Sequence, residues 1–227
     1  MKGGRVHACI FMAICVVKGM DIIMYEQERI QLKEICKLLY ERQLVTASDG
    51  NISMRLNEKH IIITPSRKNK GLLQPEDMIV TDLDGNVAEG RGKASSEFLM
   101  HRAIYQNRPE VNAIIHTHPV YATAFALAGK NIPDDHLIEA RVILGPTALA
   151  EYGTPGTPEM AEVIAPHIRK VNSILLKNHG AITYGMDLID AYNRMDVLEA
   201  VAKTIIVSKM LGDPEVISKE NLAKLKG

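Results

Sequence analysis

The sequence predicts an α/β fold in which helices pack on one mixed β-sheet, and two observations support this. Along the chain, short runs of alternating or β-branched residues are interspersed with longer segments of helical periodicity. Tight-turn signals such as Asp84-Gly85 also join neighbouring runs directly, and only antiparallel strands can be joined so tightly. The chain has 227 residues, which suits a single domain.

The first half of the chain carries most of the strand signals. Apolar residues separated by charged ones predict a helix over 26–43, which the turn residues of 46–51 end. Alternating or β-branched runs predict half-buried or buried strands over 52–56, 60–64, 78–81 and 111–116. Helices are expected over 96–106, with Ser95 or Ser96 as the N-cap, and over 120–128.

The second half repeats the alternation of helix and strand. Thr157 as N-cap and Pro158 at the first helical position predict a helix to about residue 170, which Pro166 could kink or break. Apolar runs over 173–177 and 181–184 predict two more strands. A long helix is expected over 187–211.

Composition and charge exclude several classes of protein. Hydrophobic residues make up 46% and charged residues 24%, which is typical of a globular chain and not of a disordered one. Lys and Arg total 27, as do Asp and Glu, so the balance gives no electrostatic reason to expect nucleic acid or a membrane surface as partner. Cys9, Cys15 and Cys36 are odd in number and form no disulfide framework, which favours a reducing cytoplasmic location.

The first 23 residues form an apolar N-terminal extension ahead of the domain expected over 24–227. The stretch 6–17 is nearly all apolar but is shorter than the roughly 20 residues that span a bilayer. We favour a disordered lead or an over-extended start, with Met20 or Met24 as the true initiator. A buried helix or strand and a targeting segment preceded by Lys2 and Arg5 are the alternatives.

Three histidines are the strongest chemical signal. His116 and His118 are two residues apart at the end of a predicted strand, so both imidazoles point to the same face. His179 also follows an apolar strand, and strand ends along one edge of an α/β sheet are where ligands gather. Three protein ligands with an open position are typical of catalytic zinc, although each histidine alone could be a surface or capping residue. The other histidines are interpreted as structural or solvent-facing: His7, His60, His101, His136 and His167.

Three loops offer donors for a phosphate group. Ser95-Ser96-Glu97 opens a helix, where hydroxyls and free N–H groups suit an anion. Asp49-Gly50-Asn51 offers close backbone approach and an amide, and Ser66-Arg67 offers a hydroxyl and a guanidinium fork. Each alone is more often an ordinary cap, turn or strand exit. Together they indicate a small phosphate ester as ligand, with Glu97 as metal ligand or proton carrier if it faces the metal.

Six stretches of this chain resemble the zinc-dependent class II sugar-phosphate aldolase and epimerase family, most closely its fuculose-phosphate aldolases. The resemblance covers about residues 25–212. The matching stretches are Thr46-Ala-Ser-Asp-Gly-Asn-Ile-Ser53, Ile63-Thr-Pro-Ser66, Ser95-Ser-Glu97, Ala113-Ile-Ile-His-Thr-His-Pro119, Tyr152-Gly-Thr-Pro-Gly-Thr157 and Leu176-Lys-Asn-His-Gly-Ala181. It implies α/β/α layers around a mixed, mostly antiparallel central sheet, and a cyclic homotetramer with the active site at the subunit boundary.

The resemblance also implies roles for single residues. His116, His118 and His179 would bind one Zn²⁺ per subunit, for which Co²⁺ or Mn²⁺ could substitute. Glu97 would be the catalytic acid and base, with a pKa raised by partial burial, and could be a fourth ligand. The substrate phosphate would be surrounded by Gly50, Asn51, Ser66, Arg67, Ser95 and Ser96.

The activity implied is a metal-dependent lyase. It would cleave a ketose 1-phosphate such as L-fuculose 1-phosphate to dihydroxyacetone phosphate and an aldehyde by a retro-aldol step. Family members that act as L-ribulose-5-phosphate 4-epimerase or methylthioribulose-1-phosphate dehydratase are alternatives, and an adducin-like binding module without metal histidines is a remote one.

Two positions depart from the family pattern. Fuculose-phosphate aldolases carry a tyrosine from the neighbouring subunit that handles the proton on the aldehyde oxygen, and here that place holds Leu137. Either His136 or Tyr152 serves instead, or the aldehyde differs. Arg67 stands where those aldolases often have glycine.

Overall fold

The computed structural model describes residues 24–225 and, within them, one mixed sheet of eight strands. The strands are β1 (Asn51–Arg55), β2 (His60–Ile63), β3 (Ile79–Asp82), β4 (Val87–Glu89), β5 (Ala113–Thr117), β6 (Thr147–Ala150), β7 (Ser173–Leu176) and β8 (Gly180–Gly185). Their order across the sheet is β4-β3-β2-β1-β5-β8-β7-β6. Only the β6–β7 pair is parallel, which confirms the mixed, mostly antiparallel sheet.

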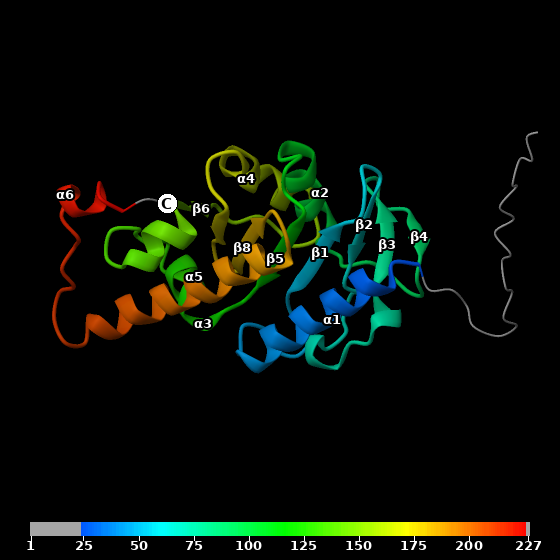
Figure 1. Ribbon diagram of the computed structural model, residues 1–227, viewed down its shortest axis with the longest axis horizontal. Coiled ribbons are helices and arrows are strands. Elements are labelled where there is room, and N and C mark those ends of the chain that lie inside the picture. Colours follow the sequence, from blue (N-terminus) through cyan, green and yellow to red (C-terminus); the bar gives the residue numbers. More distant parts are fainter. Residues whose placement is uncertain (1–23, 226–227) are drawn as a thin grey trace, which may run out of the picture.

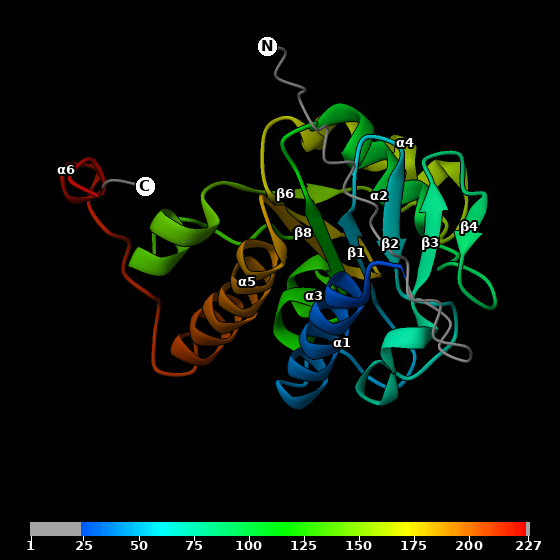
Figure 2. The same ribbon diagram turned by 45° about the vertical axis from the view of Figure 1, so that its right-hand side comes forward.

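Helices cover both faces of the sheet and give three layers (Figures 1 and 2). The helices are α1 (Glu26–Glu41), α2 (Phe98–Asn107), α3 (Val120–Leu127), α4 (Pro158–Ile168), α5 (Leu188–Ser208) and α6 (Lys219–Leu222), with short helical turns η1 (Lys70–Leu72), η2 (Pro75–Asp77) and η3 (Ala140–Leu144). Residues of α1, α3 and α5 share one hydrophobic core, and residues of α2 and α4 share the other. The predicted α/β/α layering is therefore confirmed.

The central strands contribute side chains to both hydrophobic cores, because successive side chains of a strand point to opposite faces of the sheet. In β5, Ile115 belongs to the core under α1 and α5, whereas its neighbour Ile114 belongs to the core under α2 and α4. All five β5 residues are buried. Strand 52–56 was expected to be half buried, but its polar Ser53 is fully buried because α2 covers that face.

Most predicted elements are present, with three corrections. The helix over 158–168 runs through Pro166 without a break. Glu97, and not Ser95 or Ser96, occupies the N-cap of α2, although Ser95 Oγ accepts a hydrogen bond from Glu97 N at 3.3 Å. Strand β6, a four-residue edge strand, and the one-turn helix α6 have no counterpart in the prediction, because such short elements carry too little periodicity.

The register of the central strands gathers several loops at one edge of the sheet. Asn51 at the start of β1 pairs with His116 at the end of β5, and Thr117 pairs with Ala181 at the start of β8. The turn before β1, the end of β5 and the turn between β7 and β8 therefore meet at one place. No helix between residues 24 and 225 has the length and apolar character needed to cross a membrane. The expected N-terminal extension lies outside the described residues.

Candidate active site

Three imidazoles converge at this edge of the sheet. His116 is on β5, His118 is the first residue after that strand, and His179 is in the turn between β7 and β8. Their ring centroids are 4.7, 4.8 and 4.9 Å apart, and one ligand nitrogen from each ring lies within 4.8 Å of the other two. The structure thus brings together the three residues that the sequence nominated as metal ligands.

Backbone contacts fix these rings. His116 Nδ1 donates to the carbonyl oxygen of Ala181 at 2.9 Å, so its Nε2 is free to face His118 Nε2 at 3.1 Å. A side chain at position 180 would place a Cβ 2.6 Å from the His118 ring, so only glycine allows the β7–β8 turn to approach so closely. A hydrogen bond from the ring nitrogen that does not face the metal, such as the bond of His116 Nδ1 to Ala181, is the usual way in which a metal-binding histidine is oriented.

The donor set fits a divalent transition metal. Burial lowers the pKa of His118 to about 3 and that of His179 to about 4, with the charge of His116 adding to the effect, so both rings are neutral and keep a lone pair for a metal. His179 Nδ1 is buried without a hydrogen-bond partner among the described residues. Burial also lowers the pKa of His116, but Glu97 outweighs it, and the net pKa is raised.

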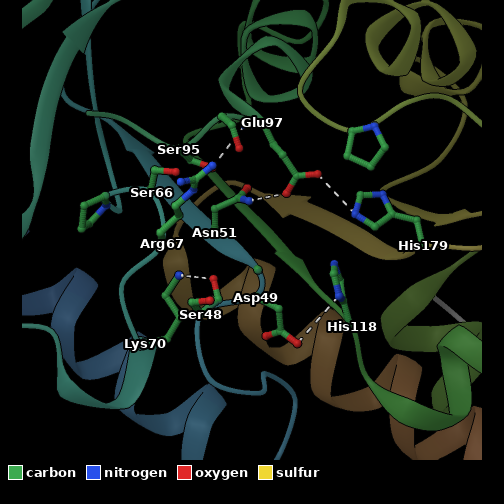
Figure 3. Close-up of a pocket in the computed structure, with 14 residues that line it drawn as sticks. Ser48, Asp49, Asn51, Ser66, Arg67, Lys70, Ser95, Glu97, His118 and His179 are labelled. Atoms are coloured by element: carbon green, nitrogen blue, oxygen red, sulfur yellow. Dashed lines mark hydrogen bonds and ion pairs between the residues drawn. The ribbon is translucent and has the colours of Figure 1, made fainter. Parts of the chain in front are cut away.

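Glu97 lies against the triad. One carboxylate oxygen is 3.2 Å from His116 Nε2 and the other is 3.3 Å from His179 Nε2. Asn51 Nδ2 donates to the first of these oxygens at 2.7 Å (Figure 3). The expected rise in the pKa of Glu97 is wrong for this structure. Burial does raise it, but the charge and hydrogen bond of His116 outweigh burial and hold the pKa of Glu97 well below its usual range.

A polar pocket of about 240 Å³ opens beside Glu97, His118 and His179. It is also lined by all six residues predicted to bind phosphate: Gly50, Asn51, Ser66, Arg67, Ser95 and Ser96. Gly50 has φ +68°, and a Cβ there would meet the His116 carbonyl oxygen at 2.7 Å, so this turn requires glycine. Figure 3 shows Ser66 and Arg67 on one side of the pocket and the two histidines on the other.

Two further charged residues line the pocket, Lys70, which the sequence did not indicate, and Asp49, which it indicated only as part of a turn. Lys70 is 2% exposed, and its Nζ donates to the carbonyl oxygens of Ser48 at 3.0 Å and Lys68 at 2.9 Å. Burial lowers its pKa, an effect that Cys36, Asp49 and Glu97 oppose. Asp49 Oδ2 lies 3.7 Å from His118 Nδ1. The only sequence signal for Lys70 was its place shortly after the nominated Ser66-Arg67 loop.

His136, Leu137 and Tyr152 do not line this pocket in the chain described. His136 Nδ1 contacts its neighbour Asp135 at 2.6 Å, and Leu137 packs against the core under α5. Tyr152 is 51% exposed. Within one subunit, none of the three replaces the tyrosine that the family pattern leads one to expect.

The fold and this site define a class of enzyme with a three-histidine centre at the edge of an α/β/α sandwich. The sequence model described as "Class II Aldolase and Adducin N-terminal domain" matches residues 30–206. The chain belongs to this family.

Three relatives show what kinds of activity accompany this similarity. An L-fuculose phosphate aldolase of Methanococcus maripaludis is 42% identical over 170 residues, 75% of this chain and 91% of that protein. A 3-oxo-tetronate 4-phosphate decarboxylase of Haemophilus influenzae is 32% identical over 201 residues, 84% and 95% respectively. A solved L-fuculose 1-phosphate aldolase superposes with a TM-score of 0.80 at 32% identity, covering 87% of this chain and 93% of that one.

The family and its aldolase relatives make this chain a carbon–carbon lyase. The three imidazoles and Glu97 form a site suited to such chemistry. A binding module would have no use for that site, which disfavours the adducin-like alternative.

Proposed function

We propose that this lyase is a metal-dependent aldolase that cleaves a ketose 1-phosphate, such as L-fuculose 1-phosphate, to dihydroxyacetone phosphate and an aldehyde. The observation that carries the proposal is the convergence of His116, His118 and His179 beside Glu97 at the end of a polar pocket. The three histidines would hold Zn²⁺, or Co²⁺ or Mn²⁺ in its place, with Glu97 as a further ligand in the absence of substrate. The metal would supply a Lewis acid for the charge that develops on the substrate carbonyl oxygen.

The chain's own residues would do the rest. Retro-aldol cleavage breaks the bond between C3 and C4, leaves the electron pair on the three-carbon fragment, and releases the proton of the C4 hydroxyl. Glu97, whose carboxylate starts ionised, would take up a proton from solvent and donate it to C3, while the C4 hydroxyl proton leaves to solvent. In the direction of synthesis Glu97 would remove the proton from C3. Its carboxylate is held for this by Asn51 on one side and by the histidines on the other.

The opposite side of the pocket would take the phosphate. Ser66 and Arg67 supply a hydroxyl and a guanidinium there, and Gly50, Ser95 and Ser96 complete the wall. Arg67 has φ +58°, a conformation strained for a non-glycine residue, which supports a functional reason for its presence. Asn51, which was also predicted to contact phosphate, uses one N–H on Glu97 and has a second to offer.

Lys70 is expected to add to phosphate affinity because its buried ammonium lies on the Arg67 side of the pocket (Figure 3). The variant Lys70→Met should raise KM for the phosphorylated substrate about 10- to 100-fold, the worth of one charged hydrogen bond, with one metal per chain retained. Lys68→Met is the matched control, since Lys68 is exposed and pairs with Asp77. Equal KM values for both variants would contradict the expectation.

A second candidate reaction is decarboxylation of a 3-oxo sugar-acid phosphate. It is favoured by the decarboxylase relative, which matches 84% of this chain. Loss of CO₂ from a 3-oxo acid also leaves an electron pair next to a carbonyl, so the same metal site and proton donor would serve it. The epimerase alternative would use the same cleavage and then rejoin the rotated aldehyde, and the dehydratase alternative would use the metal to eliminate water.

One screen tests these reactions together. The purified protein is incubated with several ketose 1-phosphates, L-ribulose 5-phosphate, methylthioribulose 1-phosphate and 3-oxo-tetronate 4-phosphate, with and without a chelator. We expect dihydroxyacetone phosphate from a ketose 1-phosphate, its loss with chelator, and its return with Zn²⁺. Release of CO₂ without any aldol cleavage would establish decarboxylation as the reaction. Activity that a chelator does not change would contradict the proposed dependence on a metal.

We further propose that the protein works in the cytoplasm as a homotetramer with its active site at the subunit boundary. None of His136, Leu137 and Tyr152 brings a proton donor for the aldehyde oxygen into the pocket of its own subunit, which supports a contribution from a neighbour. The buried free thiol of Cys36 agrees with a reducing location. Sedimentation of the native protein tests the number of subunits.

A further inference from the structure

A chain of buried hydrogen bonds runs inward from Glu97. Asn51 Nδ2 bonds Glu97 at 2.7 Å, and Asn51 Oδ1 bonds His101 Nε2 at 2.5 Å. On the other side of its ring, His101 Nδ1 bonds Ser53 Oγ at 2.7 Å, and Ser53 Oγ bonds the hydroxyl of Tyr105 at 2.8 Å. The four residues beyond Glu97 are at most 3% exposed. Two elements supply this chain of hydrogen bonds, which we call the relay: Asn51 and Ser53 lie on β1, and His101 and Tyr105 lie on α2.

The donor at each link can be assigned from Glu97 outward. Asn51 turns its NH₂ toward a Glu97 carboxylate oxygen and its own oxygen toward His101 Nε2. His101 must then carry a proton on Nε2. Burial lowers the pKa of His101 to about 3, so the ring has one proton only, and Nδ1 must accept from the Ser53 hydroxyl. Tyr105 in turn donates to Ser53.

This arrangement leaves the Asn51 amide a single orientation. If the amide turned over, its oxygen would face a carboxylate oxygen at about the 2.7 Å of the present bond, and its NH₂ would face the His101 N–H. Both contacts would be repulsive, and Asn51 and His101 are buried away from water that could relieve them. The proton on His101 Nε2 is therefore what holds the Asn51 N–H on the Glu97 carboxylate.

We propose that His101 is a positioning residue for the lyase reaction, acting through Asn51 to hold Glu97 toward the reacting carbon. The inference rests on the proposed role of Glu97 as proton donor. It assigns a purpose to a histidine that the sequence left among the structural or solvent-facing ones, and to a buried serine at a polar position of a strand.

Two substitutions of His101 separate positioning from simple packing. His101→Gln keeps an N–H donor near the place of Nε2, whereas His101→Asn is too short to reach Asn51 but keeps a group for Ser53. For His101→Gln we expect kcat within about threefold of that of the parent protein. For His101→Asn we expect kcat to fall about 10- to 100-fold, the range typical of losing a hydrogen-bond partner behind a metal site. KM should change less than about threefold in both, with one metal per chain retained. Tyr105→Phe, at the far end of the relay, should keep kcat within about twofold.

Thermal unfolding of both His101 variants guards against a folding effect. A role confined to packing predicts that the two variants lose activity in step with their loss of Tm, and that outcome, or full kcat in His101→Asn, would overturn the proposal. The ¹⁵N shifts of the His101 ring in the parent protein give a readout without catalysis. A proton on Nε2 is expected, and a proton on Nδ1 would overturn the proposal even if neither variant folds. If Glu97→Gln turned over normally while His101 carried its proton on Nε2, the proposed role of Glu97 would fail and the hydrogen-bond assignment would stand.

Discussion

The variant His116→Ala is expected to lose its metal and nearly all carbon–carbon cleavage. His116 is fully buried and lies between His118 and Glu97, and its Nδ1 is committed to the Ala181 carbonyl. Alanine removes one of the three imidazoles proposed to hold the metal and puts no other donor in its place. Metal affinity should fall more than about 100-fold and turnover about 10³-fold, since losing only a hydrogen-bond partner of a ligand already costs 10- to 100-fold.

Metal content measured on the purified variant, together with cleavage rates at increasing Zn²⁺, checks this expectation. His167→Ala is the matched control, because His167 lies on α4 and does not line the pocket. That control should keep one metal per chain and parental turnover. A His116→Ala protein that cleaves substrate at the parental rate would exclude the three-histidine centre.

The sequence indicated this centre well because its elements are local. A His-x-His pair at the end of an apolar strand places two rings on one face whatever the rest of the fold does. The sequence could not show that β8 is the neighbour of β5, because strand order is set by pairing between distant segments. His179, the third member of the cluster, could be nominated only because it too follows an apolar strand and because the resemblance to a known family supplied the match.

Alternation misled the prediction where both faces of the sheet are covered. Ser53 alternates with Ile52 and Met54, a pattern typical of a strand with one face in water. The structure buries Ser53 against His101 and Tyr105 because α2 packs on that face. A polar residue in an alternating run can therefore mark a buried hydrogen-bond partner, and only the position of the covering helix distinguishes the two cases.

Lys70 shows a further limit. It follows Lys68 in a polar loop and has the sequence signature of a solvent-exposed turn. The structure buries it because its ammonium group satisfies two backbone carbonyls of the loops at Ser48 and Lys68. Hydrogen bonds of that kind depend on how two loops meet, which no local pattern encodes.

The variant Glu97→Gln is expected to keep its metal and to lose proton transfer. Glutamine has nearly the size of glutamate, and its carbonyl oxygen can accept the hydrogen bond from Asn51 that the carboxylate accepts at 2.7 Å. The three imidazoles remain, so one metal per chain should be retained. The amide cannot carry the proton to and from C3, and kcat should fall about 10²- to 10⁴-fold, the usual contribution of a general acid–base group.

A partial reaction isolates this step from the rest of the cycle. In D₂O, the enzyme should exchange a C3 proton of dihydroxyacetone phosphate without any aldehyde present, because synthesis begins with removal of that proton. Glu97→Gln should abolish the exchange, whereas Glu162→Gln, at an exposed position on α4, should leave the rate unchanged. The exchange needs neither carbon–carbon bond cleavage nor the missing proton donor for the aldehyde oxygen. Full exchange in Glu97→Gln would therefore assign the proton transfer to another residue. Asp49 would be the carboxylate to examine, because it lines the same pocket beside His118.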